Sequence, residues 1–212
     1  MKANYSTVTK ILRVVAVCLL ASALSQAEAA DGRVIDQDGK PLAGVWVFVE
    51  WTGSSLFGLL SPHSSTGCDM VVARTDSKGE YRARKWLLGL REIGSITLYL
   101  PGYRRISGPK LYEEDRVPSV MGSDERPAVE RLREMARLAD RLDCGGYIDQ
   151  HKDESAALMR TMTAEADSLA RSKTERLTVV AIRDWLYRIE VGREEGTRRV
   201  RSEIDAIRAA PD

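Results

Sequence analysis

The sequence has little histidine, little cysteine and no excess of charge of one sign. Its 212 residues include two histidines and three cysteines, and the formal net charge is +1. It contains no Gly-rich phosphate-binding loop, no Gly-x-Ser-x-Gly elbow and no cysteine pair at metal-ligand spacing. The balanced charge provides no overall field that would select nucleic acid. We therefore predict no catalytic residue, no cofactor, no metal site and no nucleic-acid partner.

Long hydrophobic runs are also missing, apart from one near the N-terminus. Basic residues precede an apolar run at 14–24, which leads into small residues around Ala27 and Ala29. This order is that of a secretory signal peptide, and the run is short for a membrane span. We predict that residues 1–29 are a signal peptide, cleaved after Ala29 or alternatively after Ala27. The mature protein would then be periplasmic or extracellular, with no stable membrane span.

Removal of residues 1–29 leaves two cysteines, Cys68 and Cys144. Two cysteines in an exported protein are most simply one disulfide, because the compartment is oxidising. The alternative is a pair of independent free thiols. A Cys68–Cys144 bridge would join the two halves of the chain.

Residues 30–106 are expected to form an antiparallel β-sandwich. Together with the helical region expected after it, this predicts the fold class α+β. Turn residues punctuate this stretch at Asp38-Gly39, at residues 76–79 and at Pro101-Gly102. We expect the Asp of the first turn to bond its own backbone two residues on. The predicted strands cover 31–36, 45–51, 70–75, 81–86, 96–100 and 103–106. Prolines and glycines then predict a linker over 107–122.

The run Val45–Trp51 is apolar on both faces. By the period of two, Val47 and Val49 point one way, whereas Trp46 and Phe48 point the other. A sheet with one solvated face would alternate apolar and polar residues. We therefore expect the second face to be covered by the helical C-terminal region.

The connection at 52–68 is long and carries embedded apolar residues. Loops of this length are usually functional or mobile, and exposed apolar side chains there would make a binding surface. The alternative is a plug that folds back on the sandwich. The candidate partner-binding residues of this loop are Leu56, Phe57, Leu59, Leu60 and His63.

Residues 123–212 change to a helical period and predict three to four helices. Apolar stripes at spacings of three and four favour helices over about 124–142 and 153–171. Ser172 and Glu175 have the spacing of a capping box, so another helix should begin there. Its stripe continues past Gly192 and Gly196, which leaves open one long helix or two.

Three pieces of the N-terminal half carry a family resemblance. They are residues 32–45 (GRVIDQDGKPLAGV), residues 75–81 (TDSKGEY) and Pro101-Gly102-Tyr103. Together they resemble the carboxypeptidase regulatory-like domain, a transthyretin-like seven-stranded β-sandwich. The resemblance covers 31–106 only. It implies an accessory module for folding, interaction or sometimes carbohydrate contact, without catalytic residues.

Two further patterns invite a functional interpretation. His151 and Glu154 have the spacing of two zinc ligands, but no histidine follows to supply a third. Tryptophans could stack on sugars, although core or interface positions are favoured; they are Trp46, Trp51, Trp86 and Trp185.

The sequence therefore predicts an exported, non-catalytic binding or scaffold module that contacts a cell-envelope protein. A carbohydrate-contacting module is the alternative, and an unrecognised hydrolase is a weaker third hypothesis. The sequence leaves the oligomeric state open.

Overall fold

The computed structural model describes residues 28–53, 69–85, 91–108, 117–142 and 151–211. These residues form seven strands and four helices, which confirms the predicted α+β class. The strands are β1 (Glu28–Ile35), β2 (Trp46–Gly53), β3 (Asp69–Arg74), β4 (Glu80–Lys85), β5 (Arg91–Tyr99), β6 (Tyr103–Ser107) and β7 (Ser119–Ser123). The helices are α2 (Ala128–Arg141), α4 (Lys152–Leu169), α5 (Lys173–Val191) and α6 (Arg193–Ala209).

The strands form two sheets that pack face to face. One sheet has the order β4-β1-β7-β6 and the other has the order β3-β2-β5. A cluster of buried side chains from both sheets fills the space between them: Val34, Val45, Val47, Val49, Tyr81, Ala83, Ile96 and Met121. The inward face of residues 45–49 is thus the one that the period of two predicts.

Strand β7 corrects two expectations. Residues 107–122 were expected to be a linker and the sandwich to be wholly antiparallel, yet β7 pairs with β6 and runs parallel to β1. The glycine in β7, Gly122, lies where Ile106 and Gln37 pack close, since a Cβ there would meet their side chains at 2.5 and 2.6 Å. A glycine that looked like a loop signal therefore marks a close approach within a strand.

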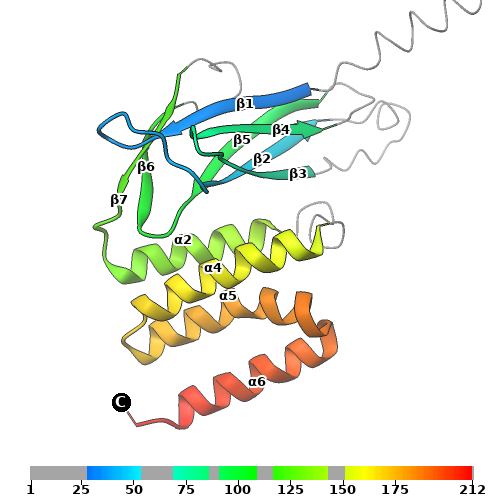
Figure 1. Cartoon of the computed structure of the whole chain (residues 1–212). Coiled ribbons are helices and arrows are strands. Elements are labelled where there is room, and N and C mark those ends of the chain that lie inside the picture. The colour runs from blue at the N-terminus through cyan, green and yellow to red at the C-terminus, as the bar shows by residue number, and fades with distance from the viewer. Residues whose placement is uncertain (1–27, 54–68, 86–90, 109–116, 143–150, 212) are drawn as a thin grey trace, which may run out of the picture.

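The outer face of the three-stranded sheet is covered by helices, as the two-sided pattern of β2 predicted. Trp46 and Phe48 are 3% and 1% exposed, and they belong to one cluster with buried residues of α2, α4 and α5. Figure 1 shows α2 directly beneath the sheets, with α4, α5 and α6 following below it. The sheet is therefore buried on both faces, and the molecule has three layers: sheet, sheet and helices.

Two equivalent Asp turns close the strand connections at one end of the sandwich. The Asp36 carboxylate accepts hydrogen bonds from the amides of Asp38 and Lys40 at 2.9 and 2.8 Å. The Asp76 carboxylate accepts in the same way from Lys78 and Glu80, at 2.8 and 2.9 Å. The expectation that Asp38 itself makes the backbone bond was wrong, because the carboxylate two residues earlier already satisfies these amides.

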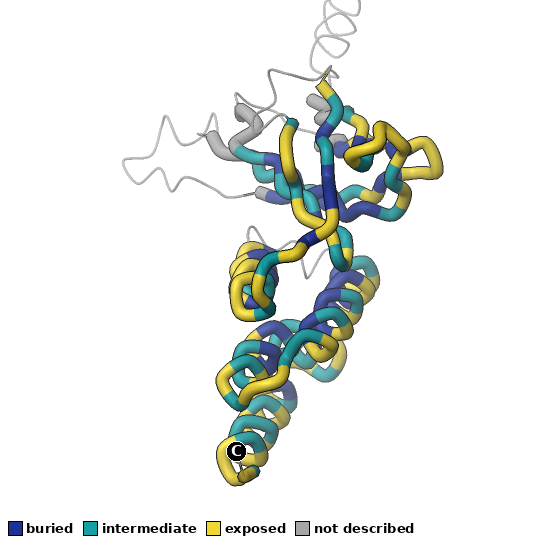
Figure 2. The backbone as a smooth tube through the Cα atoms, turned by 90° about the vertical axis from the view of Figure 1, so that its left-hand side faces the viewer, coloured by how far each residue is buried: buried dark blue, intermediate teal, exposed yellow. Residues whose placement is uncertain are grey.

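The C-terminal apolar stripe, which left one long helix or two open, is divided between the two helices α5 and α6. The capping box is confirmed: Glu175 donates its amide to the Ser172 hydroxyl, and its carboxylate accepts from the Ser172 amide. The chain breaks at Gly192, with φ of 85°, whereas Gly196 continues within α6. Gly196 lies close to α5, since a Cβ there would be 3.1 Å from the Arg188 backbone nitrogen. Figure 2 shows the helices leading away from the sheets, with the C-terminus at the far end.

Several predictions fall outside the described residues. These are most of the signal peptide, both members of the Cys68–Cys144 pair and the candidate loop residues Leu56, Phe57, Leu59, Leu60 and His63. Strand β1 begins at Glu28, three residues earlier than the predicted strand. Across the described residues, none of the helices combines the length and apolarity that crossing a membrane requires.

Candidate functional site

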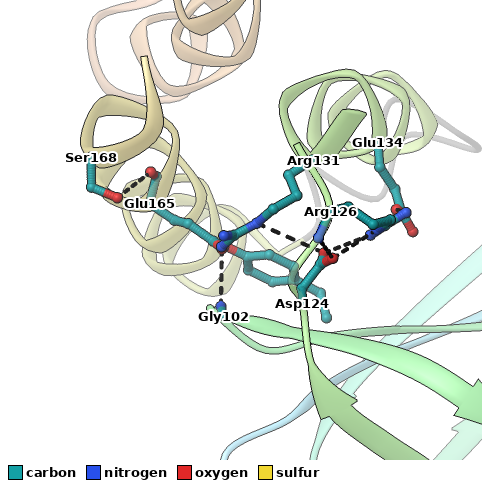
Figure 3. A network of polar contacts seen from close by, with 8 residues as sticks. Gly102, Asp124, Arg126, Arg131, Glu134, Glu165 and Ser168 are labelled. Carbon is teal, nitrogen blue, oxygen red and sulfur yellow. Dashed lines mark hydrogen bonds and ion pairs between the residues drawn. The ribbon is translucent and has the colours of Figure 1, made fainter. Parts of the chain in front are cut away.

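A buried carboxylate on α4 connects the helical layer to the sheets. Glu165, whose side chain is 10% exposed, accepts a hydrogen bond from the Tyr99 hydroxyl at 2.8 Å and from the Gly102 amide at 2.9 Å. The Arg131 guanidinium of α2 donates to the same carboxylate. Figure 3 shows Arg131 reaching from its helix toward Glu165, above the turn at Gly102. One carboxylate therefore joins β5, the β5–β6 turn, α2 and α4.

A second carboxylate, Asp124, lies next to this cluster at the connection from β7 to α2. Its side chain is 5% exposed and receives two bonds from the Arg126 guanidinium, at 2.7 and 2.6 Å. Arg131 Nε lies 3.8 Å away, and the Asp124 amide donates to the Gly102 carbonyl at 2.9 Å. We call Tyr99, Asp124, Arg126, Arg131 and Glu165 the clasp (Figure 3).

The surroundings of the clasp shift the pKa values of Asp124 and Tyr99 in opposite directions. The hydrogen bonds from Arg126 lower the pKa of Asp124 below its usual value. Burial, followed by the negative charge of Glu165, raises the pKa of Tyr99 far above its usual value. Tyr99 is thus a fixed neutral donor and Asp124 a fixed anion. Neither group is poised for proton transfer near neutral pH, since that requires a pKa close to the working pH.

A groove of about 750 Å³ opens beside the clasp. It lies where β5 and β6, the edge strands of the two sheets, approach α2. Its apolar wall includes Ile96, Leu98, Met135 and Leu138, and Tyr103 on β6 is 39% exposed. We call this the β5–β6–α2 groove.

Arginines dominate the charged lining of the groove. Seven arginines and four carboxylates line it: Arg104, Arg105, Arg126, Arg131, Arg133, Arg137, Arg141, Asp124, Glu130, Glu134 and Glu165. Three of the carboxylates are bound internally, since Asp124 and Glu165 belong to the clasp and Glu134 lies 2.5 Å from Arg126. The groove therefore has a positive balance that the clasp does not neutralise.

Three of these arginines are exposed and have no partner within the described part of the chain. They are Arg104 on β6 and Arg133 and Arg137 on α2. Arg133 and Arg137 stand four positions apart, so they lie on the same side of the helix. By contrast, Arg105 donates to the Ile96 carbonyl at 2.8 Å, and burial lowers its pKa. The three arginines are the groove's free positive charges.

Of the residue pairs that the sequence singled out as possible sites, only His151 and Glu154 lie in the described part of the chain. His151 is exposed and precedes α4, with Asp153 and Glu154 in the first helical turn. No group of three His, Cys, Asp or Glu side chains that could hold a metal occurs among the described residues. The candidate loop at 54–68 lies outside them.

The two tryptophans whose side chains are described, Trp46 and Trp185, pack in or against the core. Trp46 is buried at 3% exposed, with the Arg74 guanidinium 4.6 Å from its ring centre. Trp185 is partly buried against the helical core and lies under Arg188 at 4.9 Å. The favoured core and interface roles are confirmed for these two, whereas the side chains of Trp51 and Trp86 are outside the described residues.

Neither the clasp nor the groove was predicted from the sequence. Tyr99 lay within an expected strand and Asp124 at the start of an expected helix, and no role was predicted for the arginines of α2. The one available signal was the spacing of Arg133, Arg137 and Arg141 on one side of a helix. Nothing in the sequence placed that side opposite Arg104.

Comparison of this chain with family models, with curated proteins and with solved structures found no match.

Proposed function

We propose that this chain is an exported, non-catalytic binding or scaffold module that contacts a cell-envelope protein through the β5–β6–α2 groove. The observation that carries the proposal is the division of charge in the groove. Its buried carboxylates are held by arginines of the clasp, while Arg104, Arg133 and Arg137 remain exposed and unpartnered in the described structure. Such a surface can bind an anionic partner through its free guanidinium groups.

The rigidity of the surroundings supports a binding role. The clasp and the shared apolar cluster fix α2 against the sheets, so the two walls of the groove come from one packed unit. A preformed groove binds at a lower entropic cost than one that must be assembled.

The fold we propose is the transthyretin-like sandwich of the carboxypeptidase regulatory-like domain. Its support is the pairing of two face-to-face sheets with the two Asp turns in the segments that carry the resemblance. Domains of this type act as accessory modules, which agrees with a binding role. The helical region beyond residue 123 is an addition that the resemblance does not include.

Site-specific photocrosslinking in the exporting cell tests the proposed function. A photoreactive residue at Glu130, on the groove side of α2, should give a discrete adduct with one envelope protein. The same residue at Arg201, exposed on α6, is the control position. Adducts that are identical at both positions, or absent at Glu130 alone, would contradict a partner at the groove.

A further inference from the structure

We infer that the β5–β6–α2 groove binds an acidic, extended polypeptide segment in which carboxylates alternate with apolar side chains. This inference rests on the proposed binding function and names the chemistry of the partner. Its basis is the combination of free arginines, an apolar wall and two edge strands in one groove.

The charge of the groove selects an anionic ligand. Arg104 approaches from the sheet side, whereas Arg133 and Arg137 approach from the helix. All three are exposed and have no hydrogen-bond or ion-pair partner in the described residues. A guanidinium pairs a carboxylate through two parallel hydrogen bonds, so arginines on two walls can hold successive acidic side chains.

The apolar wall favours a polypeptide over a uniformly charged polymer. Ile96, Leu98 and Met135 lie in the same groove as the arginines, and Tyr103 is exposed beside them. A phosphorylated or sulfated polymer would leave this wall without a complementary surface. A peptide that alternates Glu with Leu places carboxylates on one side and apolar groups on the other.

The shape of the groove favours an extended segment. It runs beside β5 and β6, each of which is the last strand of its sheet. Its volume of about 750 Å³ is that of a pocket for a short peptide or small molecule rather than a flat interface. A globular acidic surface would not enter it, whereas a loop or terminus of a partner would.

The test is a titration of the full mature protein with a short fluorescent peptide of alternating Glu and Leu, followed by anisotropy. The control peptide carries Gln in place of Glu. We expect saturable binding of the Glu peptide alone, with an affinity that falls as salt rises because salt screens exposed charges. Equal binding of the Gln peptide would overturn the inference.

Two charge-matched variants locate the site. Arg133→Glu with Arg137→Glu should weaken binding about tenfold, since two ion pairs are lost and replaced by repulsion. Arg201→Glu with Arg208→Glu makes the same charge change at exposed positions of α6 and should leave the affinity within about twofold. Equal losses in both variants would show non-specific attraction and overturn the assignment to the groove.

Polyphosphate and a sulfated polysaccharide complete the test. If either binds in an Arg133- and Arg137-dependent manner and the Glu peptide does not, the ligand is not a polypeptide and the inference fails. A groove-specific photocrosslink from Glu130 without peptide binding would refute the acidic segment while preserving the proposed binding function.

Discussion

The hydroxyl of Tyr99, at the end of β5, donates a 2.8 Å hydrogen bond to Glu165 in the C-terminal part of α4. The bond joins the edge of a sheet to a helix that lies 66 positions further along the chain. Because Glu165 also binds the Gly102 amide and Arg131, its removal affects three other elements.

The clasp should be a major contributor to stability. Glu165→Ala leaves Arg131, 16% exposed, without its main partner, and we expect a loss of about 3 kcal/mol in the free energy of unfolding. Tyr99→Phe removes only one neutral donor and should cost about 1 kcal/mol. Urea denaturation measures both values. A loss below that of Tyr99→Phe for Glu165→Ala would contradict the central position of this carboxylate.

Two glycines with the same backbone conformation should differ sharply in their tolerance of alanine. Gly39 and Gly79 have φ of 80° and 74°, but a Cβ at Gly39 meets nothing within 4 Å. A Cβ at Gly79 would lie 2.4 Å from the Val34 carbonyl oxygen, which is backbone and cannot rotate away. Gly39→Ala should cost about 1 kcal/mol, the strain of the left-handed conformation.

Gly79→Ala should cost at least about 2 kcal/mol more, because β1 or the turn must shift. Thermal and urea unfolding of the pair measure the difference. Equal losses would mean that Gly79 is needed for its φ alone.

The turn at Asp76 should make stability depend on acid pH. Hydrogen bonds from the amides of Glu80 and Lys78 lower the pKa of the Asp76 carboxyl below its usual value. The stabilisation from this lowered pKa is fully present above the pKa of the unfolded chain. It is lost as the pH falls through the lower, folded-state pKa.

Asp76→Asn keeps an oxygen acceptor but removes the titration. The difference in unfolding free energy between the parent and Asp76→Asn should therefore be constant near neutral pH and shrink below about pH 4. Asp38→Asn is the control, since within the described residues the carboxylate of Asp38 has one ion pair, with the exposed Lys40 at 3.9 Å. A parent–variant difference at Asp76 that does not change with pH would refute the link.

Export and the disulfide are tested by the intact mass of the secreted protein, with and without reduction and alkylation. We expect a chain that starts at Ala30 or Glu28 and thiols that react only after reduction. Cleavage after Ala29 would remove Glu28 and Ala29, which pair with Lys85 and Arg84, whereas cleavage after Ala27 keeps all of β1. A full-length chain with free thiols would contradict both predictions.

Local patterns in the sequence determined much of the architecture. The alternation of Val47 and Val49 with Trp46 and Phe48 predicted a sheet buried on both faces, and the helical stripes predicted the layer that covers it. Ser172 and Glu175 specified a helix start through contacts three residues apart. Such features can be predicted from the sequence because their energies depend on near neighbours in the chain.

Other features depended on residues far apart in sequence. Strand β7 was missed because its short run contains Gly122, whereas its strand character comes from backbone pairing with β6 and β1. Gly192 and Gly196 were equivalent in sequence; one ends a helix, and the other lets α6 approach the backbone of α5.

The candidate site also depends on residues that are far apart in the sequence. The sequence by itself determined the class of fold, the turns and the apolar faces, because periodicity and short-range hydrogen bonds encode them. Only the tertiary structure decided that Tyr99, Asp124, Arg131 and Glu165 meet and that Arg104 faces the same groove as Arg133 and Arg137. Charged side chains have no fixed period, so their partners follow from how the helices dock on the sheet rather than from their spacing in the chain.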